Sequence, residues 1–347
     1  MLGEALRPRL ISVETPEQDQ LCLRLDMTVP AARAWAQRMM EDAADDRASK
    51  SPPQGALAYE GLVYRFNAAA MQRSNEHVQV GVEVFGRDAA SGVDCELVIA
   101  AWNAVQEAGV KDAQIAFGDV GLFETFVSAL GVSPQSADRL LEHAPTPGDA
   151  SAQSSALGRA FAALPREEAE RAIEEMLGFI KLDDVVGRDP KDILDRLIAK
   201  RDGAAGLTEA ARDLITRYLA VAGEPTQALD EIAKLAAEAG ADLDDSLRRW
   251  SAWLGRFHDA GLKVDRQKFD ADLGRGFSYY DGPVFEIEAP VFNGGDSPQL
   301  MSLGGGGRYD ALVGLLSERA VETPAAGAIL RPERLAQAAE RAAGGTS

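Results

Sequence analysis

The chain has 347 residues, of which 46% are hydrophobic and 26% charged, an ordinary balance for a globular protein with room for about two compact units. Its 55 acidic and 36 basic residues give a net charge of −19, which opposes contact with phosphate backbones and argues against a nucleic-acid partner. No apolar run approaches the roughly 18 residues of a membrane span, and the start lacks a secretion-signal pattern. We therefore expect no membrane insertion and a cytoplasmic location.

The residue types that bind metals or form disulfides are few. Cys22 and Cys95 both lie in apolar segments, which favours two buried, reduced thiols over a disulfide. The three histidines, His77, His143 and His258, are widely separated and lack the spacing of a zinc motif. We assign no metal and no cofactor.

The first third of the chain alternates short β-rich segments with helices. The patterns predict strands over 10–14, 21–25, 57–66, 77–86 and 113–120, and helices over 29–40 and 95–109. Long strands joined by polar loops indicate an antiparallel sheet in an α+β unit rather than a βαβ repeat.

The composition changes after residue 132. A Pro, Gly and Ser-rich linker at 145–155 lies in a segment rich in Ala, Leu, Glu and Arg, where helices are expected at 167–177, 207–221 and 228–239. Strand patterns return after Gly261. We therefore expect the first half of a mixed core over 1–132, a helical insertion over 133–260 and the second half of the core over 261–347.

One predicted strand has an unusual polar face. In 77–86, the period of two places Gln79, Gly81 and Glu83 on one face and valines on the other. Such residues on an isolated strand most often face water. The alternative is that they form the floor of a site for a small cationic ligand.

Two further polar positions lie beside predicted elements. Thr28 precedes the helix over 29–40 and is explained as its N-cap, whereas Asp26, two residues earlier, is not explained by capping. Arg65, at the end of the strand over 57–66, could pair with a carboxylate or phosphate through two parallel hydrogen bonds.

The stretch Gly274 to Tyr280 reads GRGFSYY and continues into DGPVFEIE, a pattern that predicts a strand. It places Arg275, Tyr279 and Tyr280 close together. A strand that packs its aromatic rings and exposes one charge is the simple interpretation. The other is that the arginine and the tyrosines form one wall of a binding site.

Six segments, in this order, resemble the catalytic core of histidyl-tRNA synthetase: LRLDMT, GLVYRF, QVGVEVFG, GRGFSYYDGPVFE, GGGGRYDALV and GAILRPERL. The match covers most of 20–130 and 262–336. It implies an α+β fold of the class II aminoacyl-tRNA synthetase-like type, with an antiparallel sheet flanked by helices and a helical insertion between its two halves.

The resemblance also implies a histidine pocket. Asp26 and Thr28 would hold the amino group, with Gln79 and Glu83 beside it. The two tyrosines would line the imidazole pocket, and Arg275 would face the carboxylate. The implied histidine-binding set is Asp26, Thr28, Arg65, Gln79, Glu83, Arg275, Tyr279 and Tyr280, with no catalytic residue.

The sequence departs from a synthetase where ATP and tRNA would bind. Phe66 and Asn67 follow Arg65, where the family has a glutamate two residues on that contacts adenine, and Arg331 replaces a family glycine and could obstruct ATP. Only twelve residues follow Leu335, so we expect no anticodon-binding domain. Ser278, where the family usually has an acidic residue, has no explanation.

A chain that keeps the histidine pocket but lacks the synthetase features for ATP and tRNA resembles the regulatory subunits of ATP phosphoribosyltransferase. Three segments carry the same resemblance: LCLRLDMTVPAAR, GDVGLF at 118–123 and LPREEAERAI. The resemblance implies a non-catalytic protein of histidine biosynthesis, required for activity of a short-form catalytic subunit. It would convey feedback inhibition by L-histidine and form a homodimer within a hetero-oligomer. The alternatives are a histidyl-tRNA synthetase or other histidine-activating ligase, and a different amino-acid-binding paralogue.

Overall fold

The structure is a computed structural model, and it describes residues 9–14, 20–44, 54–66, 75–132, 208–274, 279–291, 299–318 and 321–342. The predicted linker at 145–155, the predicted helix at 167–177 and the segment LPREEAERAI lie outside these ranges. The chain divides into two compact units, described separately below. The first comprises Met1–Leu122, Leu219–Ala233 and Asp244–Ser347, and the second comprises Phe123–Tyr218 and Lys234–Leu243.

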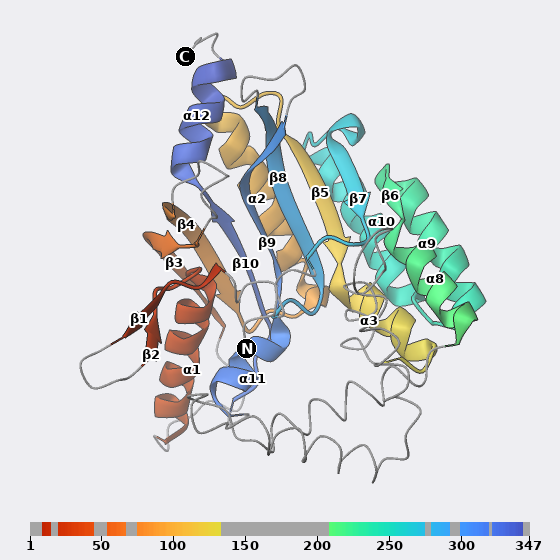
Figure 1. The fold of residues 1–347 in the computed structure, drawn as a ribbon, viewed down its shortest axis with the longest axis horizontal. Coiled ribbons are helices and arrows are strands. Elements are labelled where there is room, and N and C mark those ends of the chain that lie inside the picture. Colours follow the sequence, from red (N-terminus) through yellow and green to blue (C-terminus); the bar gives the residue numbers. More distant parts are fainter. Residues whose placement is uncertain are drawn as a thin grey trace, which may run out of the picture. The chain divides into compact units, whose positions relative to one another are not determined.

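The first unit is built on an eight-stranded sheet with the strand order β3-β4-β10-β9-β8-β5-β7-β6 (Figure 1). All neighbouring strands are antiparallel except β5 and β7. The strands are β3 (Gly55–Tyr64), β4 (Glu76–Phe85), β5 (Gln114–Asp119), β6 (Ala222–Gly223), β7 (Gln267–Asp270), β8 (Pro283–Val291), β9 (Gln299–Arg308) and β10 (Ala325–Leu330). β1 (Ser12–Glu14) and β2 (Gln20–Cys22) form a separate two-stranded sheet.

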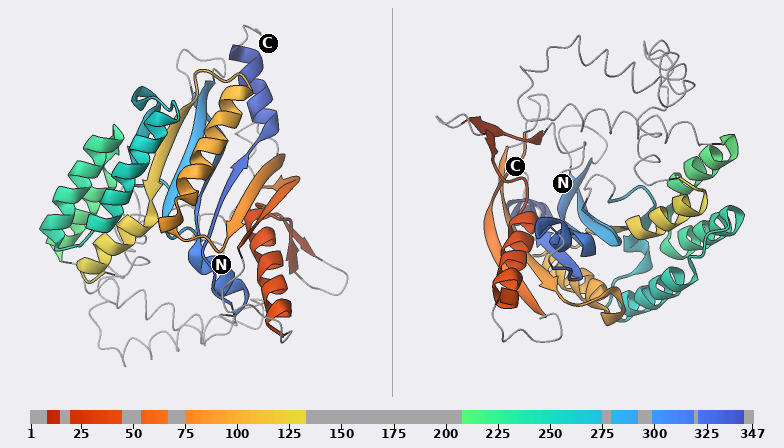
Figure 2. Two further views of the ribbon diagram at one scale, coloured as in Figure 1. Left: turned by 180° about the vertical axis from the view of Figure 1, so that it is seen from behind. Right: turned by 90° about the horizontal axis from the view of Figure 1, so that it is seen from below.

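Helix α2 (Val93–Glu107) crosses one face of the eight-stranded sheet, where it contacts β8, β9 and β10 (Figure 2). The other helices that lie wholly in this unit are α1 (Thr28–Ala44), α10 (Asp244–Asp259), α11 (Asp310–Leu316) and α12 (Pro332–Ala342). Two 3-10 helices, at Ala89–Ser91 and Val264–Arg266, also belong to this unit.

A buried ion pair joins α2 to the sheet. Asp94, in the first turn of α2, accepts hydrogen bonds from Nε and Nη2 of Arg308 on β9, at 2.9 and 2.8 Å. Arg308 also donates to Asp310 at 2.7 Å, and its side chain is 4% exposed. Because removal of one partner would strand a buried charge, this pair fixes the position of α2 against β9.

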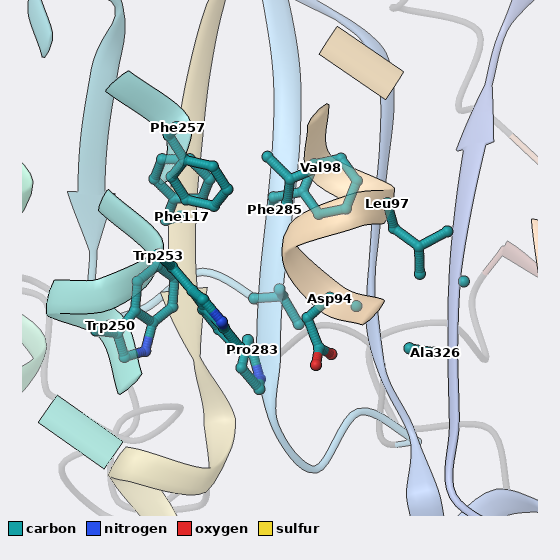
Figure 3. Close-up of a pocket in the computed structure, with 13 residues that line it drawn as sticks. Asp94, Leu97, Val98, Phe117, Trp250, Trp253, Phe257, Pro283, Phe285 and Ala326 are labelled. Atoms are coloured by element: carbon teal, nitrogen blue, oxygen red, sulfur yellow. The ribbon is translucent and has the colours of Figure 1, made fainter. Parts of the chain in front are cut away.

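The core on the α2 face is aromatic. Phe117 of β5 stacks on Phe257 of α10 with ring centroids 5.1 Å apart, and Trp250 and Trp253 meet edge to face nearby (Figure 3). The indole of Trp250 donates to Asp119 at 2.7 Å, so its polar atom is satisfied. The hollow between these rings and Val98 of α2 has a volume of about 20 Å³, room for about one water molecule.

A second core lies between α1, α11 and the opposite face of the sheet. Trp35 of α1 stacks on Phe85 of β4 with centroids 4.6 Å apart, and Tyr309 and Leu312 join the same cluster. The odd-numbered residues of β4 therefore point toward α1, which places Gln79 and Glu83 on this face as the sequence pattern predicted.

The second unit contains most of α3 (Val120–Ala129), nearly all of α8 (Glu209–Leu219) and the end of α9 (Pro225–Ala239). Tyr218 packs against Phe123 and Phe126. Arg217 forms two hydrogen bonds with Glu238, at 2.8 and 2.9 Å. The predicted helices over 207–221 and 228–239 are thereby confirmed, with their ends shifted by a few residues.

Three local predictions were wrong. The strand predicted over 21–25 ends at Cys22, which is exposed rather than buried because it lies in the two-stranded sheet, whereas Cys95 is buried as expected. Tyr279 and Tyr280 lie before β8, in a turn and an irregular segment, rather than in a strand. The boundaries predicted at 132 and 260 stay predictions.

No helix in the described ranges is both long and apolar enough to span a bilayer.

Candidate functional site

A cavity of about 250 Å³ lies on the sheet face opposite α2, close to the lower end of the roughly 300–1,000 Å³ typical of ligand pockets. Its floor consists of β4, β10, β9 and β8, and residues from the segments before α1, before β8 and after β10 complete its walls. The polar and aromatic residues that line it are Asp26, Thr28, Arg65, Gln79, Glu83, Tyr279, Tyr280, Phe285, Glu286, Tyr309 and Arg331.

Two polar residues of β4 are fully buried. Gln79 and Glu83 are each 1% exposed, whereas Val80 on the other face is 39% exposed. This reverses the usual burial of apolar and polar residues on a strand. Of the two interpretations of this face, exposure to water is wrong for this strand, because the cavity and α1 cover that face.

Glu83 is the centre of a hydrogen-bond network. Its Oε1 accepts from the hydroxyls of Thr28 at 2.8 Å and Tyr59 at 2.6 Å, and its Oε2 accepts from the hydroxyl of Tyr309. Burial raises the pKa of Glu83 to about 7, against the opposing effect of these hydrogen bonds. A carboxylate offers about four acceptor positions, so one remains for a ligand.

Asp26 lies in the segment before α1 and is 5% exposed. Its Oδ1 accepts from the backbone N–H of Val29 at 3.1 Å, but its buried Oδ2 has no hydrogen-bond partner among the described residues. Burial raises the pKa of Asp26, and the charge of Arg65 opposes that rise. Two buried carboxylates, Asp26 and Glu83, therefore face one cavity.

The roles of Asp26 and Thr28 at the start of α1 are exchanged relative to the prediction. Asp26 provides the capping acceptor for the helix, while the hydroxyl of Thr28 donates across to Glu83. The reason is positional, since a capping side chain binds the N–H group three residues on, which for Asp26 is that of Val29.

Gln79 and Arg65 hold the same segment from the sheet side. Oε1 of Gln79 accepts from the backbone N–H of Met27 at 3.1 Å, and Nε of Arg65 donates to the carbonyl of Leu25 at 3.0 Å. Burial lowers the pKa of Arg65, and the charge of Asp26 counteracts this. Both side chains thus line the cavity and position Asp26.

Three tyrosines form an aromatic wall. Tyr279 meets Tyr280 edge to face at 4.8 Å and Tyr309 at 6.0 Å between ring centroids. Burial raises the pKa of all three hydroxyls, so they stay neutral near pH 7 and can donate hydrogen bonds. The wall has both apolar ring surface and polar hydroxyls.

Two glycines give these side chains their space. A Cβ on Gly327 of β10 would coincide with Oε2 of Glu83, and a Cβ on Gly307 of β9 would lie 2.9 Å from a ring carbon of Tyr280. These two glycines therefore let the sheet floor approach the buried carboxylate and the aromatic wall closely.

Seven of the eight residues predicted to bind histidine line this one cavity, and Arg275 lies outside the described residues. The histidine-binding set predicted from the sequence lacks Tyr59, Tyr309, Glu286 and Arg331. Alternation along β3 and β8 could have placed Tyr59 and Glu286 on the same face as Glu83. Tyr309 lies directly after the glycine run and Arg308, so its place beside this motif could have indicated that it belongs to the site.

The comparisons with known proteins agree on one family. The family model described as histidyl-tRNA synthetase matches residues 1–179 and 186–335. An ATP phosphoribosyltransferase regulatory subunit from Chelativorans sp. (strain BNC1) is 31% identical, over 91% of this chain and 83% of that protein. Its name agrees with the family expected from the sequence motifs.

Solved structures give the same result for the fold. A structure described as an ATP phosphoribosyltransferase regulatory subunit/histidyl-tRNA synthetase from Bacillus halodurans is 25% identical, with a TM-score of 0.57 over 96% of this chain and 69% of that one. A histidine–tRNA ligase subunit from Alicyclobacillus acidocaldarius is 25% identical, with a TM-score of 0.52 over 96% of this chain and 80% of that one. Both confirm the class II synthetase-like fold. The chain belongs to the histidyl-tRNA synthetase family, among the relatives named as ATP phosphoribosyltransferase regulatory subunits.

Proposed function

We propose that the chain is a non-catalytic regulatory subunit of ATP phosphoribosyltransferase, which binds L-histidine in this cavity and conveys feedback inhibition. The observation that carries the histidine site is the pair of buried carboxylates, Asp26 and Glu83, of which Asp26 has an oxygen without a partner in the described chain. Buried carboxylates are costly unless a cation or donors satisfy them. The α-ammonium group of an amino acid supplies both.

The remaining walls fit the side chain of histidine. An imidazole ring needs an aromatic surface and at least one hydrogen-bonding group, and the wall of Tyr279, Tyr280 and Tyr309 offers both. Arg275 is the predicted partner of the carboxylate, and it stays a prediction. The cavity volume of about 250 Å³ suits a small metabolite rather than a macromolecule.

The partner follows from the names of the relatives. A regulatory subunit of ATP phosphoribosyltransferase acts on a catalytic chain, which we propose is of the short form and depends on this chain for activity. A homodimer within a hetero-oligomer and a cytoplasmic location stay predictions from the sequence. Histidine inhibits only if it binds one state of the complex more tightly than the other, with a coupling of typically about 1–3 kcal/mol.

Reconstitution tests the proposal. The full chain is mixed with a short-form catalytic subunit, and the ATP- and phosphoribosyl-pyrophosphate-dependent rate is measured with and without histidine. We expect activity only in the mixture and a lower rate with histidine. An unchanged rate in both comparisons would refute the regulatory role, and activation without inhibition would refute the histidine site alone.

A histidine-activating ligase is the second candidate, because the matching family model and the Alicyclobacillus relative bear that description. Such an enzyme exchanges pyrophosphate into ATP when histidine is present. We expect no histidine-dependent exchange from this chain. Exchange that requires histidine would replace the regulatory proposal with the ligase.

A further inference from the structure

Arg331 is a buried cation in the cavity wall whose hydrogen-bonding capacity is mostly unused. It lies between β10 and α12, and its side chain is 8% exposed. Nη1 donates to Oγ of Ser302 at 2.6 Å, whereas the buried Nε has no partner among the described residues. A guanidinium has five N–H donors, and a buried unsatisfied donor costs about 1–3 kcal/mol, more when it is charged.

The groups around Arg331 make its charge less favourable. Burial, and then the charges of Arg65 and Arg334, lower the pKa of Arg331 to about 9, and Glu286 only partly offsets them. In the part of the chain that the structure describes, Arg331 forms no ion pair. An anion bound in the cavity would satisfy Nε and reduce the repulsion among the three guanidinium groups.

A second orphaned group lies on the same side. The buried Nε2 of His77 on β4 has no partner in the described ranges. Its pKa is lowered to about 4 by burial and then by Arg65, Arg331 and Arg334, so the ring is neutral and adds no positive charge near pH 7. His77 does not line the cavity, so among the described residues Arg331 is the cavity residue that offers unused donors, while Asp26 and Glu83 supply the unused acceptors.

We propose that Arg331 binds the anionic oxygen group of the ligand in this cavity. A planar guanidinium matches the geometry of a carboxylate or a phosphate, and both Nε and Nη2 are available for two parallel hydrogen bonds. The identity of that group rests on the proposed function: for histidine it is the α-carboxylate, for which Arg331 takes the role that the sequence resemblance gives to Arg275, and for a nucleotide-type ligand it is a phosphate. On this proposal Arg331, which was expected to obstruct ATP, is itself a ligand-binding residue.

A purely structural role makes a different prediction. If Arg331 only ties the start of α12 to β9 through Ser302, its replacement changes stability without changing which ligands bind. Ligand discrimination separates the two roles. Histidine and histidinol differ in that an alcohol replaces the carboxylate, so the ratio of their dissociation constants reports the contact with the anion.

The experiment measures both dissociation constants by calorimetry on the full chain and on Arg331→Met, Arg331→Lys and the control Arg341→Met. Arg341 lies on α12, the helix that directly follows Arg331, and donates to the carbonyl of Pro290 at 3.3 Å, outside the cavity. We expect the wild type to bind histidine at least about tenfold more tightly than histidinol, a difference of about 1.4 kcal/mol. Arg331→Met should bring the ratio near one by weakening histidine binding, Arg331→Lys should lower it partly, and the control should keep it.

A ratio that stays unchanged in Arg331→Met, or in Arg331→Lys if the methionine variant does not fold, overturns the proposal. If the wild type binds neither compound, the histidine site has failed, and inorganic pyrophosphate becomes the probe. Pyrophosphate binding that Arg331→Met abolishes keeps the anion site with a phosphate as its ligand. Absence of pyrophosphate binding to the wild type then overturns the anion site too.

Discussion

Replacement of Glu83 by glutamine tests the carboxylate side of the cavity, and its first effect is on stability. Burial raises the pKa of Glu83 from 4.5 to about 7. This shift penalises the ionised carboxylate by about 3 kcal/mol, since one pKa unit equals about 1.4 kcal/mol. Between the two values the unfolded chain binds fewer protons than the folded one, so the free energy of unfolding falls as the pH rises. Glu83→Gln should remove this fall, which lies between about pH 4.5 and 7.

The second effect is on the ligand. A bound ammonium group stabilises the ionised form of Glu83, so histidine should bind better as the pH rises through the pKa of about 7. The ionised fraction grows from about 0.1 at pH 6 to about 0.9 at pH 8, which is about a tenfold gain in affinity. The imidazole of free histidine titrates in the same range. The ratio of variant to wild-type dissociation constants cancels that contribution.

Calorimetric titration of histidine into both proteins at pH 6, 7 and 8 measures this ratio. Loss of one partner of a buried charge pair costs about 2–5 kcal/mol, so we expect Glu83→Gln to bind about 100-fold more weakly at pH 8 and about tenfold more weakly at pH 6. The Tyr309 hydrogen bond holds the pKa of Glu83 down, so Tyr309→Phe should move the midpoint of this change to higher pH. A ratio that does not vary with pH would show that the ionisation of Glu83 has no part in binding.

Two further predictions concern stability. Asp94→Ala leaves the buried Arg308 with Asp310 as its remaining carboxylate partner and should lower the free energy of unfolding by about 3 kcal/mol in urea titrations, whereas the double replacement Asp94→Leu with Arg308→Met should recover most of this loss. An equal loss in the double variant would contradict the assigned cause. Gly327→Ala puts a methyl group against Glu83 and should cost about 1–3 kcal/mol, while Gly255→Ala, with open space beside it in α10, should be neutral or gain up to about 1 kcal/mol. Equal effects at the two glycines would count against the close approach at β10.

Much of this site could be predicted because periodicity fixes which side chains share a face. The period of two in β4 placed Gln79 and Glu83 together, and the structure has them so. Periodicity does not reveal which face is covered, however. On average burial statistics Gln79 and Glu83 belonged in water, and only the resemblance to a family indicated otherwise. The covering layer consists of α1 and the segments around the tyrosines, which a strand pattern does not contain.

The cavity residues that the predicted binding set lacks come to the site through contacts between segments far apart in the sequence. The hydroxyl of Tyr309 meets Glu83 across 226 positions, and Arg331 borders the cavity because β10 lies between β4 and β9. The difference between the predicted and observed roles of Asp26 and Thr28 has a local cause. Because the capping side chain is that of Asp26, two residues before Thr28, the hydroxyl of Thr28 is left to donate to Glu83. Single-residue boundaries of helices are where sequence patterns are least decisive.

The distribution of charge around the cavity explains how a binding site could become a regulatory one. Asp26 caps α1, and Arg331 lies directly before α12, so a zwitterion held between them connects the starts of two helices to the sheet floor. Oδ2 of Asp26 and Nε of Arg331 are buried without partners among the described residues, so this arrangement has a cost that a ligand could remove. On the proposed function, a ligand that satisfies both groups would stabilise this arrangement relative to one in which the two helix starts are solvated. Such a difference in affinity between two states is what the proposed feedback inhibition requires.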